Sequence, residues 1–254
     1  MLAALSWGLT GLGPQARGQE AAAFAAREEL LRTAPIITVS KDESTGRTNS
    51  WKVYLNDGEK AFRAIFKYIH RPRPRPLPSS YHYELAAYAL NKLYGLGLVP
   101  PTIEREVDGL KGSLQCFCEG VMSEAARRRK KIQPPEGINF QDAMAEVGLF
   151  ENLTNNLRED ASDILINISD WKVWRVDFSE AFAPDKDILT SSPFTRCSRR
   201  LYARLLEVSD EALRNALQPY LNGEEIDALL VRKKLIVDWL GALIRDKGEA
   251  AVLF

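Results

Sequence analysis

The chain of 254 residues has only two histidines, three cysteines and no net charge. Three cysteines cannot build a disulfide framework, and Cys116 and Cys118 fit neither a metal quartet nor a redox C-x-x-C motif, so we expect free or buried thiols. Equal numbers of basic and acidic residues, 34 of each, exclude a general electrostatic attraction to nucleic acid or anionic membrane. Beyond the N-terminus, no stretch reaches the roughly 20 apolar residues that span a bilayer.

The first 20 residues differ from the rest in composition. An apolar run from Leu2 to Gly13 precedes the small-x-small sequence Ala16-Arg17-Gly18, as in a signal peptide, but the usual basic opening residues are missing. Two alternatives remain open. Residues 1–20 are either the cleaved signal of a secreted or periplasmic protein, or a disordered tail on a cytoplasmic one.

A hydrophobic content of 45% is enough for a full core, in one domain or two modest lobes. The periodicity, the caps and the turn residues predict both helices and strands. We expect helices at 21–32, 80–94, 124–132, 140–153, 196–206, 210–220 and 224–245, and strands at 36–39, 51–55, 61–69, 102–107, 111–118, 164–166 and 172–176.

The stretch from Asn156 to Phe182 is the part of the chain that the rest is expected to support. Its two short apolar strands are joined by the polar turn 167–170, which has the composition of a hairpin. Antiparallel pairing would bring Asp163 and Asp177, at the outer ends, close together. Two neighbouring carboxylates repel unless a cation or a proton lies between them, so the pair suits a hard ion such as Mg²⁺. The alternative is a pair of solvated acids at strand ends.

Lys67 and Glu84 form a second candidate pair. Lys67 ends the apolar strand AFRAIFK, and Glu84 lies beside the apolar stripe of the helix that follows. Each has a simpler explanation, since a lysine at a strand end commonly extends to solvent and a helical glutamate commonly faces water. A strand lysine, a helix glutamate and an aspartate after a hairpin together form the arrangement by which kinase-like folds hold ATP and metal.

With these residues in place, the chain resembles a bacterial family of kinase-fold proteins that has remote similarity to the protein-kinase and lipid-kinase superfamily. The resemblance covers residues 28–244, and its clearest pieces are YELAAYALNKLYGLGLVPPTIEREVDG, KGSLQ, DWKVWRVDFSEAF and RCSRRLYARLLEVSDEALRNALQPYL. It implies an α+β, two-lobed protein-kinase-like fold. Residues 21–119 would form an N-lobe with an antiparallel sheet and one helix, and residues 120–254 a mainly helical C-lobe.

The resemblance also implies ATP and Mg²⁺ as cofactors. Lys67 would neutralise the α- and β-phosphates and be positioned by Glu84, while Asp163 and Asp177 would hold the metal ion. In the same family the loop between the first two strands covers the phosphates, and here it contains Gly46. An ordinary hairpin is the alternative for that loop.

The resemblance further places the adenine hinge after the strand 111–118. Gln115 and Cys118, within the stretch 115–119, are hinge candidates by position only.

The catalytic loop departs from the family pattern N-x-D-R-x-x-x-N. Asn156 matches the first position, but Arg158 stands where the catalytic aspartate belongs, and Asp163 replaces the metal-binding asparagine. A guanidinium group is not deprotonated in proteins, so Arg158 cannot act as a base. Asp160 or Glu159 would take that role if the loop shifts by one or two residues.

Two basic runs remain outside this scheme. RPRPRP at 71–76 is either a stiff linker or a docking arm for an acidic or phosphorylated partner. RRRKK at 127–131 is either a solvated helix face or a phosphate-binding patch.

We carry three hypotheses for the function. The first is an ATP- and Mg²⁺-dependent kinase-like phosphotransferase with an altered catalytic loop, acting on a protein or small-molecule acceptor. The second is a pseudokinase that binds nucleotide or a partner without catalysis. The third is an interaction domain that has lost the site.

Overall fold

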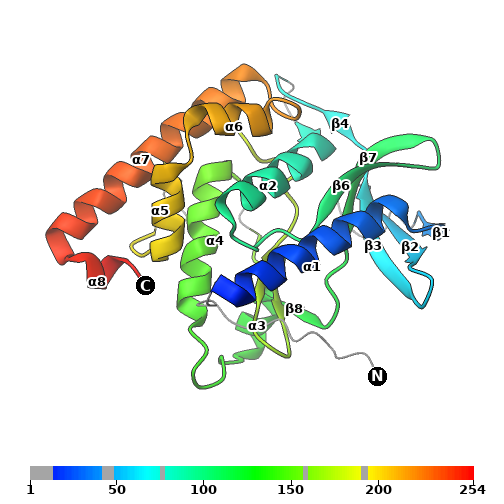
Figure 1. Cartoon of the computed structure of the whole chain (residues 1–254), viewed down its shortest axis with the longest axis horizontal. Helices are drawn as coiled ribbons and strands as arrows, with labels where there is room; N and C mark the ends of the chain where they lie inside the picture. Colours follow the sequence, from blue (N-terminus) through cyan, green and yellow to red (C-terminus); the bar gives the residue numbers. More distant parts are fainter. Residues whose placement is uncertain (1–13, 42–48, 75–77, 157–159, 190–193) are drawn as a thin grey trace.

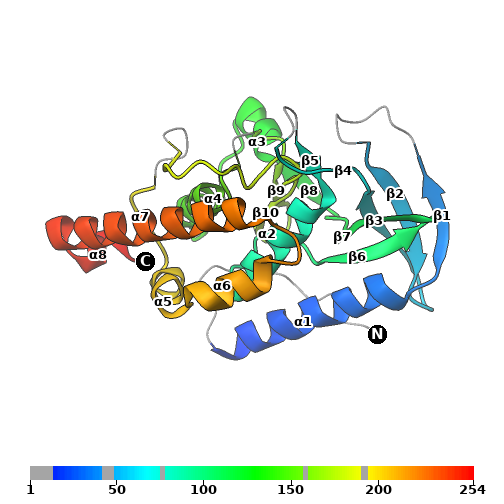
Figure 2. The same ribbon diagram turned by 90° about the horizontal axis from the view of Figure 1, so that it is seen from above.

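The large sheet lies at one end of the molecule and most of the helices lie at the other, with helix α2 (Tyr81–Tyr94) between them (Figures 1 and 2). This arrangement comes from a computed structural model that describes residues 14–41, 49–74, 78–156, 160–189 and 194–254. The predicted α+β class with two lobes is confirmed. Within the described residues, no helix is both long enough and apolar enough to cross a bilayer.

The N-lobe is built on a five-stranded antiparallel sheet in the order β1-β2-β3-β7-β6. Alternation of buried and exposed residues explains why the strands form, and it is clearest in β2, where Trp51, Val53 and Leu55 face inward. Beneath the sheet, these side chains pack with Phe66 and Leu114 in a small core. The strands are β1 (Ile36–Ser40), β2 (Trp51–Asn56), β3 (Ala61–Lys67), β6 (Thr102–Val107) and β7 (Leu110–Cys116).

Helix α1 (Pro14–Thr33) contacts both lobes and begins earlier than the predicted 21–32. The guanidinium of Arg105, in β6, donates to the carbonyl oxygens of Leu31 at 2.6 Å and Ala34 at 2.9 Å, which satisfies acceptors at the end of the helix. Nearer its start, Phe24 stacks on Trp174 with ring centroids 6.0 Å apart. The tripeptide at 16–18 that resembles a cleavage site lies inside this helix.

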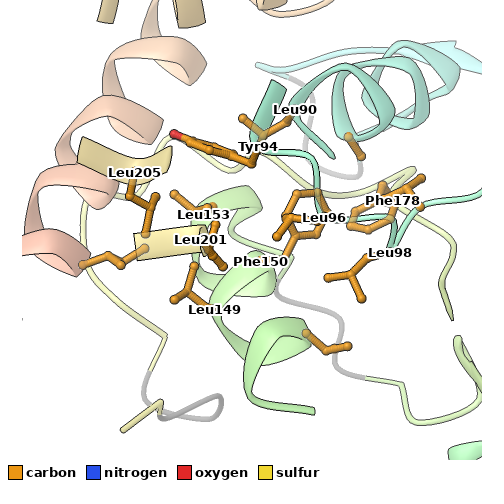
Figure 3. Packing of buried hydrophobic residues seen from close by; sticks show 14 of the residues in the cluster. Leu90, Tyr94, Leu96, Leu98, Leu149, Phe150, Leu153, Phe178, Leu201 and Leu205 are labelled. Carbon is orange, nitrogen blue, oxygen red and sulfur yellow. The ribbon is translucent and has the colours of Figure 1, made fainter. Parts of the chain in front are cut away.

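Helix α2 joins the core of the C-lobe. The side chain of Ser80 caps its first turn by accepting from the amide of His82, and Gly95, with φ of 64°, ends it. Its residues Leu90 and Tyr94 are fully buried against Leu201 and Leu205 and the helix that carries Leu149 and Leu153 (Figure 3). Glu84 therefore lies on a helix that is held from the helical side as well as from the sheet.

The predicted hairpin at 164–176 is confirmed as β9 (Ile164–Asn167) and β10 (Val173–Arg175), with Val173 opposite Ile166. A third strand, β8 (Val121–Ser123), pairs with β9 and was not predicted. The C-lobe helices are α3 (Glu124–Lys130), α4 (Phe140–Thr154), α5 (Arg199–Glu207), α6 (Asp210–Leu217), α7 (Gly223–Lys247) and α8 (Glu249–Val252). Helix α8 was also not predicted, because four residues are too few for a periodicity signal.

Both basic runs are partly used inside the fold. In α3, Arg127 and Arg128 each place Nε 2.6 Å from the buried carboxylate of Glu124. The segment 70–80, which we call the strap, contains the first run and holds the short strands β4 (His70–Arg71) and β5 (Ser79–Ser80), which pair with each other. Residues 75–77 of the strap lie outside the described residues.

Candidate functional site

Lys67 and Glu84 form an ion pair between the sheet and helix α2. Lys67 is the last residue of β3, and its Nζ atom lies 2.6 Å from Oε1 of Glu84. Glu84 is 2% exposed, in the first turn of α2, where the partial positive charge of the helix N-terminus favours a carboxylate. The two simpler readings, a lysine extending to solvent and a glutamate facing water, are therefore wrong.

Asp177 lies on the other side of the same lysine, with Oδ1 2.7 Å from Nζ. It follows β10 and has φ of 63°, a left-handed conformation that is uncommon for a residue other than glycine. The next residue, Phe178, holds the turn at this point. Its amide donates to Oε1 of Glu84 at 3.0 Å, and its side chain is fully buried against Phe150, with ring centroids 5.6 Å apart (Figure 3).

The charge on Lys67 is stabilised by this environment. Burial favours the neutral amine, but the carboxylates of Glu84 and Asp177 outweigh that effect, and the pKa of Lys67 is raised. Its side chain is 13% exposed. The site therefore keeps a permanent positive charge next to Asp177.

Ser179 completes this group and was missed by the sequence analysis. Its Oγ atom lies 2.8 Å from Oε1 of Glu84, 3.1 Å from Oδ1 of Asp177 and 3.1 Å from Nζ of Lys67. One hydroxyl hydrogen can serve only one of the two carboxylates, while the oxygen accepts from the lysine. The only sequence signal was its position two residues after Asp177.

Asp163 lies close enough to Asp177 for the two charges to interact. Burial, and then the negative charge of Asp177, raise the pKa of the Asp163 carboxyl from 3.8 to about 6. The backbone joins the two ends of the hairpin, since the amide of Val176 donates to the carbonyl oxygen of Asp163 at 3.0 Å. Arg175, which is completely buried, places NH1 3.9 Å from Oδ2 of Asp163 and donates from Nε to Glu151 at 2.8 Å.

The loop before β9 is described only at its two ends. Asn156 is buried, and its side-chain amide lies 3.5 Å from the carbonyl oxygen of Asp177. Asp160 accepts the amide of Ser162 at 2.8 Å, and its charge is one of the smaller contributions that raise the pKa of Asp163. Arg158 and Glu159, at 157–159, lie outside the described residues, as does Gly46 of the predicted phosphate loop.

The hinge candidates are placed differently from each other. Gln115 lies between β3 and β6 within the sheet, and its side chain donates to Oγ1 of Thr102 at 2.9 Å. Cys118 lies in the segment that joins β7 to β8. Burial raises the pKa of its thiol to about 12, so it is neutral at physiological pH. Both residues stay predictions as adenine contacts.

The donor chemistry at the Asp163–Asp177 pair fits Mg²⁺. That ion is commonly bound through one or two carboxylates and completed by waters and substrate phosphates. Among the described residues, no group of three or more histidine, cysteine or acidic side chains forms a cage that would bind a metal ion without such help.

The comparisons with known proteins support the fold. No family model and no curated protein matches the sequence. The solved structures that are similar include hydra Fam20 with a sugar, at 15% identity and a TM-score of 0.67, covering 89% of this chain and 90% of that one. They also include the Helicobacter pylori proinflammatory kinase CtkA, at 9% identity and a TM-score of 0.51, covering 82% of this chain and 96% of that one. The chain thus has a kinase-like fold.

Proposed function

We propose that this chain is an ATP- and Mg²⁺-dependent kinase-like phosphotransferase with an altered catalytic loop. The observation that carries the proposal is the position of the Lys67 ammonium between the carboxylates of Glu84 and Asp177, at 2.6 and 2.7 Å. A lysine fixed by a helix glutamate, next to an acid that can bind metal, is the arrangement that phosphoryl transfer needs. The kinase-like fold supports the same reading.

Each residue then has a defined part. Lys67 would donate to the α- and β-phosphates of the nucleotide, and Glu84 would keep its ammonium in place. Asp163 and Asp177 would hold the metal ion, which supplies charge neutralisation at the β- and γ-phosphates when bound. Positioning and charge neutralisation provide most of the rate enhancement in phosphoryl transfer, so activity can survive a change at the base.

Asp160 is our first candidate for the base, and Glu159 is the second. General-base catalysis contributes about 10²- to 10⁴-fold. If neither residue performs it, the chain is a slow enzyme or a pseudokinase that binds nucleotide without turnover. The observation that favours the pseudokinase is Arg158 at the position of the catalytic aspartate.

A turnover assay separates these alternatives. Transfer of labelled γ-phosphate from ATP would be followed with protein and carbohydrate acceptors, the latter because the hydra Fam20 structure is described with a sugar. Wild type would be compared with Asp177→Ala, and Asp187→Ala, an exposed acid ten positions later, would be the control. We expect Mg²⁺-dependent turnover that is lost only in Asp177→Ala. Binding without turnover would leave the pseudokinase.

A further inference from the structure

The strap donates hydrogen bonds to the backbone of the segment that follows Asp177. Three consecutive carbonyl oxygens accept hydrogen bonds from strap residues. The amide of Ser80 donates to Ser179 at 2.9 Å, and the guanidinium of Arg73 donates to Glu180 at 2.9 Å and to Ala181 at 2.8 Å. These contacts join parts of the chain about one hundred residues apart.

Arg73 is built into the molecule and is not free to act as a docking arm. Its side chain is 14% exposed and lies over the ring of Tyr83, with the guanidinium carbon 5.3 Å from the ring centroid. The buried carboxylate of Glu225, at the start of α7, lies 3.5 Å from NH1 and also accepts from the hydroxyl of Tyr83 at 2.7 Å. The carboxylate lies near the charge of this partly buried guanidinium, and two carbonyl oxygens accept from NH1 and NH2.

A fully buried arginine of the C-lobe holds the next residues of the chain. Arg232, in α7, donates from NH1 to the carbonyl oxygens of Ala183, at 3.1 Å, and Asp185, and from NH2 to that of Leu153 at 3.0 Å. Residues 180–185 therefore run between an arginine of the strap and an arginine of α7.

The stretch 177–182 has an unusual backbone conformation at both of its ends. Asp177 and Phe182 have φ of 63° and 59°, both left-handed. Such conformations are unfavourable for residues other than glycine and persist only where the surroundings fix them. Phe182 is fixed by its amide, which donates to the carbonyl oxygen of Thr154 at 2.6 Å. Arg73 supplies the fixed point between the two.

We propose that Arg73 is a positioning residue that, through the carbonyls of Glu180 and Ala181, sets the orientation of Asp177 toward a bound metal–nucleotide complex. The inference rests on the function proposed above. It assigns Arg73, within the proline-rich run, a role in supporting the site in place of a linker or docking arm.

The test uses Arg73→Met, which keeps the bulk of the side chain but removes the guanidinium, with Arg71→Met as the matched control. Arg71 belongs to the same run and is exposed. Amide hydrogen exchange of the free protein is measured over residues 178–182. We expect exchange about tenfold faster in Arg73→Met and unchanged in Arg71→Met, because the carbonyl contacts that hold the segment are lost.

The second readout is nucleotide affinity with and without Mg²⁺. Loss of a group that orients a metal ligand lowers metal affinity by about 10- to 100-fold. We expect a loss of that size in Arg73→Met with Mg²⁺ and none without it. Faster exchange with an unchanged metal-dependent affinity would overturn the proposal, and so would an equal loss with and without metal.

These experiments distinguish a failure of the Arg73 proposal from a failure of the proposed function. If wild type binds no nucleotide, the proposed function fails, while the exchange measurement still decides whether Arg73 holds the segment. Arg73→Lys provides the second variant in case the methionine variant does not fold. Lysine keeps the charge but lacks the planar guanidinium, so we expect an exchange rate between the rates of wild type and Arg73→Met. Wild-type exchange in Arg73→Lys together with normal metal-dependent affinity would contradict the proposal.

Discussion

The Nζ atom of Lys67 lies 2.7 Å from Oδ1 of Asp177, 110 residues later in the chain. This contact joins the two lobes at the point where we propose that nucleotide and metal bind. The lysine already serves as the counter-ion of an acid that would coordinate the metal ion. Nucleotide and metal would therefore bind to a site whose charges are paired in advance.

The Lys67–Glu84 pair should show strong energetic coupling. Lys67→Met leaves the buried carboxylate of Glu84 without its cation, and breaking a buried pair from one side costs about 3–5 kcal/mol of unfolding free energy. Glu84→Gln keeps an acceptor for the amide of Phe178. Urea unfolding should show that the double variant loses less stability than the sum of the losses in the two single variants.

The exposed pair Lys234–Asp238, with side chains 76% and 57% exposed, is the control for this cycle. Its coupling should be close to zero, because solvent screens exposed ion pairs. Additive effects at Lys67 and Glu84 would mean that the two residues do not act as a unit.

Asp163 should make stability depend on pH. Its folded-state pKa of about 6 is above its ordinary value of 3.8, so the folded state binds the proton more tightly than the unfolded state. The ionised carboxylate therefore destabilises the fold above pH 6, and this cost disappears as the pH falls from 6 to 4. At pH 8 the free energy of unfolding of Asp163→Asn should exceed that of wild type by up to about 3 kcal/mol. At pH 4 the two free energies should be nearly equal.

Chemical unfolding at several pH values measures this difference, with the exposed Asp187→Asn as the control for loss of one charge. Saturating Mg²⁺ with ATP should narrow the difference at pH 8, because a bound cation would neutralise the repulsion between the Asp163 and Asp177 carboxylates of wild type. An Asp163→Asn variant that is less stable than wild type at every pH would contradict the assigned environment.

Ser179 should contribute to both stability and binding. Removing its hydroxyl leaves the buried Glu84 with one donor fewer, at a cost of about 1–3 kcal/mol. We expect Ser179→Ala to be destabilised by that amount and to bind Mg²⁺–ATP about tenfold more weakly, which corresponds to about 1.4 kcal/mol. Ser162→Ala, at an exposed position, should change neither quantity. Wild-type stability and affinity in Ser179→Ala would remove Ser179 from the site.

Gly112 allows the strand that ends in Lys67 to lie where it does. A Cβ atom at this position would overlap the carbonyl oxygen of Lys67 and the ring of Phe66. Gly112→Ala should therefore lower stability by about 1–3 kcal/mol through overpacking and also weaken ATP binding. Gly223→Ala, where the new atom meets nothing within 4 Å, is the control. Unchanged ATP affinity in Gly112→Ala would show that β7 does not position the lysine.

Local patterns predicted much of the fold and part of the site. The alternation in β2, the hairpin around 167–170 and the serine cap with terminal glycine of α2 are all short-range signals, and each formed as expected. The pairing of Lys67 with Glu84 was suggested by a resemblance to kinase-fold proteins. Sequence spacing alone could not have distinguished it from two solvated side chains.

Contacts across long separations could not be predicted. The run that contains Arg73 predicts a stiff linker or a docking arm, because an extended proline-rich segment shows no local sign of a partner. The carbonyl oxygens that accept from Arg73 belong to residues more than one hundred positions away. Arg175 looked like an ordinary residue of a short strand, yet it is completely buried against Glu151. In both cases the arginine donates to groups that only the folded chain brings together.

The most direct test of the account is a thermal-stability titration with ATP, with and without Mg²⁺, on wild type and Asp177→Ala. Ligand at one hundred times its Kd should stabilise wild type by about 2.7 kcal/mol. We predict that this stabilisation requires Mg²⁺ and disappears in Asp177→Ala, whose own fold remains cooperative. No stabilisation of wild type at millimolar Mg²⁺–ATP, or an equal one in Asp177→Ala, would contradict it.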